Sequence, residues 1–312
     1  MKILIIDKTD EYFKKQLIIN NCVIIEKLDD SKEKILENFD FDGLILRSRF
    51  NIDSSFIKRA KGLKFIARYG SGIEHIDINS ARKNNITCIN CPEGNKDAVA
   101  EHTIGLILCL LNKINLSNNQ IKQGIWNREE NRGLELMHKT IGVIGYGNTG
   151  QSLCDKLKGF NCNIIVYDKY KKNYGNDFIK EVSMNEIFNN SDILSIHIPL
   201  NNETKNMINN SFLNKFKKPI FFINTSRGKI INTNDLITLL KNQKVLGACL
   251  DVLEYEENSF ENINSKNDNM IFLKKSNNVL LTPHIAGLTF ESKKRLSEIL
   301  AKKILDFIKS IK

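Results

Sequence analysis

The sequence predicts an α/β protein with parallel sheets covered by helices on both faces. Three observations support this fold class. Short apolar runs rich in Ile, Val and Leu alternate with helix-compatible segments along most of the chain, which is typical of repeated β-α units. One such unit, Lys139–Asp168, carries a glycine-rich turn. The 312 residues are also long enough for two domains, each with its own core.

The first 92 residues alternate regularly and predict a small α/β domain of flavodoxin-like size. Strands are expected at Lys2–Asp7, Val23–Glu26, Leu44–Leu46, Phe65–Ala67 and Thr87–Asn90. Helices are expected at Glu11–Ile19, Ser31–Asn38, Ser54–Lys61 and Asn79–Asn84.

The remainder of the chain begins with a mostly apolar segment, predicted as one helix from Asp97 to near Gly124. Its length suits a helix that crosses between domains or lines a dimer interface. Trp126–Met137 is polar and predicted to be an irregular connector, and residues 253–277 a long surface loop. Further helices are expected at Gln151–Lys158, Met184–Asn189, Asn210–Lys215, Thr233–Lys241 and after Thr289. Further strands are expected at Ile141–Ile144, Ile164–Tyr167, Ile193–Ile198, Ile220–Asn224, Gly247–Val252 and Val279–Thr282.

The composition excludes several classes of protein. The net charge of +10 would suit a nucleic-acid partner, but lysines are spread along the chain and no basic block is interleaved with aromatic residues. No apolar run reaches the roughly 18 residues of a membrane span, and the N-terminal apolar core is too short for a signal peptide. We therefore expect a cytoplasmic protein that binds neither nucleic acid nor membrane. Seven scattered cysteines with one isolated CxxC, at Cys88 and Cys91, predict reduced thiols and no metal.

The glycine-rich unit predicts a dinucleotide site of the Rossmann type. Gly145 permits a tight turn, Gly147 lets the backbone approach a pyrophosphate, and Gly150 lets helix and strand pack closely. The N-terminus of the following helix offers free N–H groups to the phosphates. Asp168 lies about 20 residues further on, where a carboxylate accepts ribose hydroxyls and repels a 2′-phosphate, which favours NAD over NADP. The alternative is a sugar-nucleotide site or a Rossmann unit that binds nothing.

Four more patches follow predicted strands, where parallel sheets bind ligands. They are Leu46–Arg49, Ala67–Gly72, Asn224–Gly228 and Thr282–Gly287. A lone arginine is usually a surface charge and a lone histidine usually structural. Four strand-end patches, each with an arginine or histidine, are better explained as parts of one site.

With these patches, the chain resembles the D-isomer-specific 2-hydroxyacid dehydrogenase family over nearly its whole length. The matching segments are RYGSGIEHIDINSARKNNI, NCPEGNKDAVAEHTIGLIL, KTIGVIGYGNTG, SDILSIHIPLNNET, FFINTSRGKIINTNDL, LGACLDVLEYEE and LTPHIAGLTFES. The nearest resemblance is to phosphoglycerate dehydrogenases in a short form without a regulatory domain. The resemblance implies a flavodoxin-like substrate domain of residues 1–95 plus 288–312. A Rossmann NAD-binding domain of residues 96–287 is inserted into it, and a homodimer is expected through the region after the long helix.

The resemblance also implies a catalytic trio. Arg227 would hold the substrate carboxylate and C2 oxygen, and His284 would take the hydroxyl proton as the hydride leaves. A glutamate would favour the imidazolium form of His284. Proline is common in the family where Glu257 stands, so the glutamate remains open between Glu254, Glu256 and Glu257, with motif spacing favouring Glu256.

Binding residues follow from the same resemblance. Coenzyme contacts are implied at Gly145, Gly147, Asn148, Thr149, Gly150, Asp168, Ile198, Pro199, Thr225, Ser226, Asp251, His284 and Gly287, with Asp251 on the nicotinamide side. Substrate contacts are implied at Arg47, Arg49, Arg68, Ser71, Gly72 and Arg227. Three of these arginines would suit a phosphate, which favours NAD-dependent oxidation of 3-phospho-D-glycerate to 3-phosphooxypyruvate, the first step of serine biosynthesis. The alternatives are a glyoxylate/hydroxypyruvate or D-lactate type reductase acting on a plain 2-hydroxy acid, and an NAD-sensing, corepressor-like binding protein.

Overall fold

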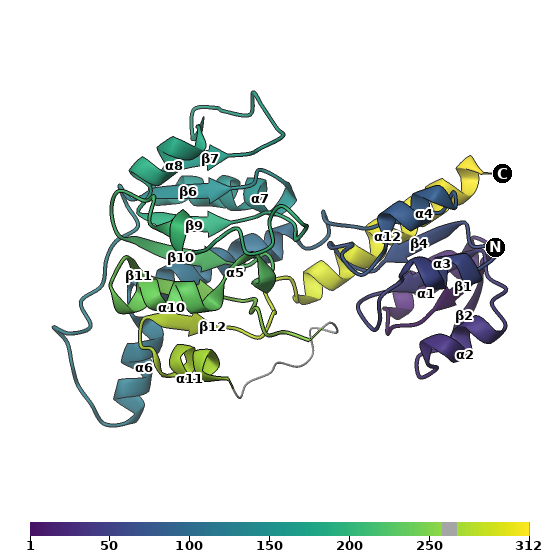
Figure 1. The fold of residues 1–312 in the computed structure, drawn as a ribbon, viewed down its shortest axis with the longest axis horizontal. Coiled ribbons are helices and arrows are strands. Elements are labelled where there is room, and N and C mark those ends of the chain that lie inside the picture. The colour runs from purple at the N-terminus through teal and green to yellow at the C-terminus, as the bar shows by residue number, and fades with distance from the viewer. Residues whose placement is uncertain (258–266, 312) are drawn as a thin grey trace. The chain divides into compact units, whose positions relative to one another are not determined.

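The computed structural model describes residues 1–257 and 267–311, which form two compact units (Figure 1). Among the described residues, the first unit comprises 1–95, Glu257 and 288–311, and the second comprises 96–256 and 267–287. Apart from Glu257, the described chain lies outside the first unit between Asn95 and Leu288.

The first unit is built on a parallel sheet with strand order β2-β1-β3-β4-β5, the flavodoxin-like order. Its strands are β1 (Lys2–Ile5), β2 (Val23–Glu26), β3 (Gly43–Leu46), β4 (Phe65–Arg68) and β5 (Thr87–Ile89). Its helices are α1 (Glu11–Ile19), α2 (Lys32–Glu37), α3 (Ser54–Arg59), α4 (Ile78–Lys83) and α12 (Phe290–Ser310).

Alternation along β1 explains why this sheet has a core on each face. Ile3 and Ile5 are buried in one cluster, which includes Phe13 of α1, whereas Leu4 is buried in the other. The C-terminal helix α12 contributes a buried row to the α1 side, which is Leu296, Leu300, Ala301, Ile304 and Ile308. The first unit thus completes one face of its sheet only with residues from the far end of the chain.

The second unit is built on a parallel sheet with strand order β12-β11-β10-β9-β6-β7-β8. Its strands are β6 (Thr140–Ile144), β7 (Asn163–Tyr167), β8 (Ile179–Glu181), β9 (Ile193–Ile196), β10 (Ile220–Asn224), β11 (Val245–Leu250) and β12 (Val279–Leu281). Its α-helices are α5 (Lys96–Leu111), α6 (Ile114–Lys122), α7 (Asn148–Leu157), α8 (Met184–Asn190), α9 (Asn210–Leu213), α10 (Thr233–Lys241) and α11 (Asp268–Lys275). Short 3₁₀ turns are η1 (Lys158–Phe160) and η2 (Gly228–Ile230). Strand order reverses beside β6, the position at which doubly wound sheets bind ligands.

Helices cover both faces of this second sheet, as Figure 1 shows. Leu110 of α5 and Leu153 of α7 belong to one buried cluster together with Val143 of β6. Ile187 of α8 and Leu236 of α10 belong to the other. The predicted α/β fold with two parallel sheets is confirmed.

The helix predicted from Asp97 to Gly124 is wrong in one respect, because it is broken. The helix α5 ends at Leu111 and α6 begins at Ile114, with a bend of 62° between them. Lys113 at the break has a left-handed backbone (φ 52°). The connector explains the stop, since the Leu134 N–H donates to the Leu111 carbonyl (3.0 Å) and so satisfies the end of α5.

Two short elements were not predicted. The helix α11 lies inside the stretch 253–277, where Asn267 caps it and Met270 and Leu273 are buried; residues 258–266 of that predicted loop lie outside the described residues. The edge strand β8 has three residues, of which Ile179 is buried. Each element has only one or two buried apolar residues among many polar ones, so neither shows a clear apolar periodicity in the sequence. Of the helices described, none is by itself long and apolar enough to cross a membrane, and α5 and α6 meet that criterion only as a bent pair.

Candidate coenzyme and catalytic site

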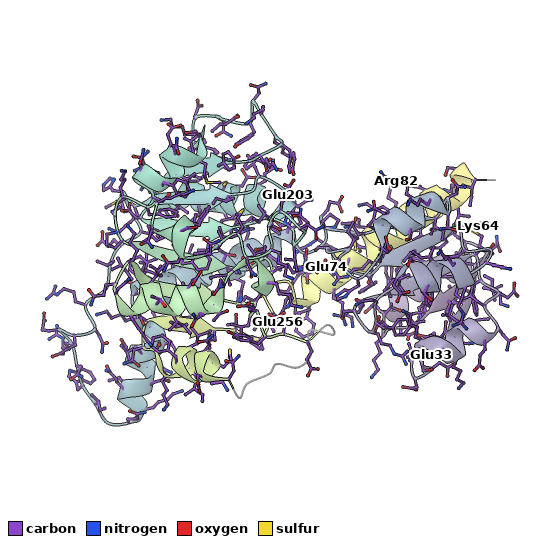
Figure 2. The ribbon with its side chains drawn as sticks, in the orientation of Figure 1. Glu33, Lys64, Glu74, Arg82, Glu203 and Glu256 are labelled. Atoms are coloured by element: carbon purple, nitrogen blue, oxygen red, sulfur yellow. The ribbon has the colours of Figure 1, made fainter. Side chains whose placement is uncertain are left out.

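The predicted site residues of the second unit lie in loops at one edge of its sheet. The loops follow β6, β7, β9, β10, β11 and β12, and every strand pairing in this sheet is parallel. The carboxyl ends of these strands therefore meet at the same edge. Figure 2 shows Glu256 in the loop that leaves β11.

The glycine loop has the conformation that its sequence predicts. Gly145 has φ 100°, and a Cβ atom there would lie 2.3 Å from the His197 carbonyl oxygen. A Cβ atom on Gly150 would lie 2.0 Å from the Gly145 carbonyl oxygen. Gly147 is the N-cap of α7 and supplies no side-chain cap. The first N–H groups of α7 are thus left for an anion, which fits the pyrophosphate of a dinucleotide.

Asp168 holds the same loop from β7. Its Oδ2 accepts the Tyr146 N–H (2.7 Å), and its Oδ1 accepts the Tyr170 and Lys171 N–H groups (2.8 Å each). Partial burial alone would raise the pKa of Asp168, but these N–H groups and the Lys171 charge hold it below its usual value. The carboxylate remains ionised, as recognition of ribose hydroxyls and rejection of a 2′-phosphate both require.

His284 and Glu256 form a pair between the β12 and β11 loops. His284 Nδ1 lies 2.8 Å from Glu256 Oε2, and Glu256 Oε1 accepts the Leu253 N–H. Among the three glutamates left open by the sequence, Glu254 instead accepts the Thr233 N–H at the start of α10 (2.9 Å), and Glu257 is exposed. A carboxylate on Nδ1 fixes the ring so that Nε2 is the nitrogen suited to proton transfer.

Asp251 anchors the turn that carries His284. It is buried (1% exposed). Oδ1 accepts the Thr282 hydroxyl (2.6 Å) and the Ile285 N–H (2.9 Å), and Oδ2 accepts the Ala286 N–H (2.9 Å). The Asp251 carbonyl accepts the His284 N–H (2.7 Å), and His284 has a left-handed backbone (φ 56°). Asp251 therefore determines the orientation of the His284 turn.

Helix α5 adds a further contact to this network. His102 Nε2 lies 3.2 Å from the Thr282 hydroxyl and 3.5 Å from Asp251 Oδ1. Thr282 belongs to the predicted Thr282–Gly287 patch, whereas His102 was not predicted as a site residue. A signal for His102 exists in the sequence, since it stands among the apolar residues of AEHTIGLIL, where a polar ring requires a partner.

Arg227 follows β10 in a turn built by Asn224. The buried Asn224 amide donates to the Arg227 carbonyl (3.0 Å), and its oxygen accepts the Ser226 N–H (3.0 Å) and hydroxyl (2.8 Å). A Cβ atom on Gly228 would lie 2.0 Å from the Leu253 carbonyl group. The glycine thus lets the Arg227 turn pack against the backbone of the Glu256 loop.

The other predicted coenzyme residues of the second unit lie along the same edge. Thr225 bonds Thr103 of α5 through the two hydroxyls (3.0 Å). The Pro199 carbonyl accepts the Thr204 hydroxyl (2.7 Å), and Ile198 lies against Gly145. Asn148 and Thr149 begin α7, and Gly287 ends the His284 turn.

In the first unit, the guanidinium of Arg49 donates hydrogen bonds to backbone carbonyls. Its Nη1 donates to the carbonyls of Ile6 (3.0 Å) and Lys27 (2.9 Å), and its Nη2 to that of Asp30 (2.6 Å). These carbonyls belong to the segments that follow β1 and β2. Arg49 thus ties loops together, and this use of the guanidinium weighs against its predicted contact with substrate.

The remaining substrate residues of the first unit are arranged differently. Arg47 is exposed, and its guanidinium makes no hydrogen bond or ion pair within the described residues. Arg68 Nε donates to the Arg47 carbonyl (3.2 Å). The Ser71 hydroxyl donates to Asn95 (2.6 Å), and Gly72 follows in the same turn. Arg47, Arg68 and the Ser71–Gly72 turn therefore remain candidates for binding an anion.

Comparison with known proteins identifies the family of the chain. Residues 104–286 match the family described as D-isomer specific 2-hydroxyacid dehydrogenase, NAD binding domain. The chain is 32% identical to D-3-phosphoglycerate dehydrogenase of Archaeoglobus fulgidus, over 100% of this chain and 58% of that protein. It is 35% identical to glyoxylate reductase of Thermofilum pendens, over 89% of this chain and 82% of that protein.

A solved structure shows the same fold. The D-lactate dehydrogenase of Aquifex aeolicus, complexed with NAD and lactic acid, matches with a TM-score of 0.85 at 25% identity, over 99% of this chain and 96% of that one. The chain thus spans little more than half of the phosphoglycerate dehydrogenase and nearly all of the lactate dehydrogenase chain.

Proposed function

Because the chain belongs to the D-isomer specific 2-hydroxyacid dehydrogenase family, an NAD-binding family of oxidoreductases, we propose that it interconverts a small D-2-hydroxy acid and its 2-oxo acid. The observation that carries the proposal is the 2.8 Å contact between His284 and Glu256, at the sheet edge that also holds the glycine loop and Arg227. NAD, when bound, supplies the hydride acceptor.

The residues have separate tasks in this proposal. Arg227 holds the substrate carboxylate and C2 oxygen in one orientation. His284 takes the hydroxyl proton at Nε2, while Glu256 on Nδ1 keeps the ring oriented and stabilises the imidazolium. Asp251 acts by holding the His284 turn. Since both of its oxygens already accept protein hydrogen bonds, this task accounts for its burial without a direct contact to the nicotinamide.

We further propose 3-phospho-D-glycerate as the substrate, oxidised to 3-phosphooxypyruvate as in the first step of serine biosynthesis. Arg47 and Arg68 support a phosphate at the β3 and β4 ends, and the A. fulgidus relative carries this activity in its name. The engagement of Arg49 favours a second candidate, a reductase of plain 2-oxo acids such as glyoxylate or hydroxypyruvate, as in the T. pendens relative. The cytoplasmic location remains a prediction.

A steady-state panel tests this proposal. The substrates are 3-phosphoglycerate, glycerate, lactate and 2-hydroxyglutarate in the forward direction, with glyoxylate and hydroxypyruvate in reverse, each with NAD(H) and NADP(H). The highest kcat/KM is expected for 3-phosphoglycerate with NAD. A preference for glyoxylate or hydroxypyruvate would select the second candidate, and no turnover on any of these acids would contradict both.

We also propose a homodimer formed through α6 and the connector. These segments and the residues that join them expose large apolar side chains, which are Ile114, Ile121, Ile125, Trp126, Leu134 and Met137. No residue of α6 is buried in the monomer. Sedimentation of the native chain should give a dimer, and Trp126→Glu together with Ile121→Glu should give a folded monomer. A monomeric native chain would contradict the assignment.

A further inference from the structure

A buried histidine lies beneath the glycine loop and has no role in the proposed proton transfer. His197 follows β9 and is 7% exposed. Its N–H donates to the Ile144 carbonyl (2.8 Å). A Cβ atom on Gly145 would lie 2.3 Å from the His197 carbonyl oxygen, and one on Gly150 would lie 3.3 Å from the His197 Cβ atom. His197 therefore forms the floor of the loop.

The ring of His197 connects two hydroxyls. Its Nε2 lies 2.8 Å from Ser195 Oγ, and its Nδ1 lies 3.3 Å from Thr149 Oγ1. Ser195 is fully buried in β9, whereas Thr149 is partly exposed in the first turn of α7. The ring thus extends from the sheet interior to the helix end that faces the predicted pyrophosphate.

Hydrogen-bond accounting selects one tautomer of this ring. Burial lowers the pKa of His197 to about 4, so the imidazole is neutral at working pH, with one donor and one acceptor nitrogen. Within the described part of the chain, Ser195 Oγ has the His197 ring as its sole hydrogen-bond partner. If Nε2 carried the proton, the buried Ser195 hydroxyl hydrogen would have no acceptor, which proteins avoid. The Ser195 hydroxyl therefore donates to Nε2, and Nδ1–H donates to Thr149.

This order of donors determines what Thr149 can do. A Thr149 oxygen that accepts from His197 keeps its own hydrogen for another acceptor. Thr149 Oγ1 has no further partner among residues 1–257 and 267–311. The N-terminus of α7, which lacks a side-chain cap, places this hydroxyl beside N–H groups that attract an anion.

We propose that Ser195, His197 and Thr149 form a one-way hydrogen-bond relay in which His197 is a positioning residue that turns the Thr149 hydroxyl into a donor for the coenzyme pyrophosphate. The inference rests on the coenzyme site and not on the identity of the substrate or on turnover. The relay adds a directional donor to the backbone groups of the glycine loop.

Binding probes with and without phosphate test the relay. Thr149→Val, which keeps the side-chain shape, is expected to weaken NADH and ADP about tenfold, because a hydrogen bond to a charged group is lost, and adenosine less than twofold. Affinities are measured by fluorescence or NMR titration without substrate. Thr238→Val, an exposed threonine of α10 that bonds only its own helix, is the matched control and should change none of the three. Equal losses for ADP and adenosine would overturn the relay.

Two substitutions of His197 distinguish its proposed role in orienting the Thr149 hydroxyl from a role in packing alone. An asparagine amide can replace the donor at Nδ1, whereas a glutamine amide reaches toward Nε2. His197→Asn should therefore keep NADH affinity within about threefold, and His197→Gln should lose about tenfold, with no further loss when Thr149→Val is added. Equal effects of the two variants would contradict the proposal, and thermal unfolding identifies any variant that is not folded.

The tautomer itself can be observed even if the variants do not fold. Long-range ¹H–¹⁵N correlation on the native protein should show His197 with a protonated Nδ1 and a bare Nε2, unchanged between about pH 5.5 and 8, since its pKa is about 4. A protonated Nε2 would overturn the relay. Absence of turnover with every acid in the substrate panel would leave it intact, because none of these measurements uses substrate.

Discussion

The carboxyl edges of the two sheets hold their charged residues in different ways. At the edge of the second unit, Glu256 contacts His284, and Asp251 holds the turn that follows. At the edge of the first unit, Arg49 donates to three backbone carbonyls. A carboxylate paired with an imidazole can respond to a proton, whereas a guanidinium paired with carbonyls stays charged and fixed.

The difference shows which strand-end charges are available for chemistry. A cation that donates hydrogen bonds to the carbonyls of neighbouring loops stabilises those loops, and its donors are then not available to a ligand. A side chain bound to another ionisable side chain can change its protonation as a reaction proceeds. Substitutions at each edge can distinguish these two tasks.

The largest effect is expected at His284. His284→Ala should lower kcat by about 10²–10⁴-fold, because the proton acceptor is lost. NADH affinity, measured by fluorescence titration, should stay within about twofold. Near-normal turnover of this variant would contradict the role of His284 as the proton acceptor at the edge of the second sheet.

Glu256→Gln should lower kcat by about 10²-fold, because an amide no longer stabilises the imidazolium form of His284. Glu254→Gln is the matched control, since Glu254 accepts the first N–H of α10. The control should keep kcat and lose about 1 kcal/mol of unfolding free energy. A larger loss of kcat in Glu254→Gln than in Glu256→Gln would exchange the two roles.

Arg49→Ala should lower the free energy of unfolding by about 3 kcal/mol, because three carbonyls lose a charged donor. Its KM should change alike for phosphorylated and plain hydroxy acids. Arg47→Ala should leave stability unchanged and raise KM about tenfold for 3-phosphoglycerate alone. Denaturant titration and steady-state kinetics on both variants check the contrast, and a phosphate-specific effect in Arg49→Ala would refute it.

The smallest effect is expected at Asp168. Asp168→Ala should reduce the preference for NAD over NADP about tenfold in kcat/KM, since an ionised carboxylate no longer repels the 2′-phosphate. Asp168→Asn, which keeps two of the backbone hydrogen bonds as an acceptor, separates charge from loop support. An unchanged coenzyme ratio in both variants would show that discrimination lies elsewhere.

The sheets and the glycine loop could be predicted from the sequence because their signals are local. Buried parallel strands are continuous apolar runs, and Gly145 and Gly150 are required by backbone approaches that leave no room for Cβ. The break at Lys113 could not be predicted, because the N–H group that ends α5 comes from Leu134, in a connector without periodicity.

The different roles of the charged residues could not be predicted from the sequence either. Arg47 and Arg49 stand two residues apart after one strand, and only the positions of distant carbonyls distinguish them. A signal for His197 exists in the sequence, since Ser195 and His197 alternate with apolar residues in SDILSIHIP. Polar residues two apart in a buried strand lie on one face and require each other.

The position of α12 has a consequence for the order in which the protein folds during synthesis. One face of the first sheet is covered by Leu296, Leu300 and Ile304, which leave the ribosome after every strand of both sheets. Arg295 and Lys303 then bond Gly94 and Glu93, fastening the last helix to the end of the N-terminal segment. Domains usually fold as they emerge, N-terminal first, but until α12 is made the first ninety-five residues have one face of their sheet covered only in part, by α1. The later-made second unit is the one that can finish its core first.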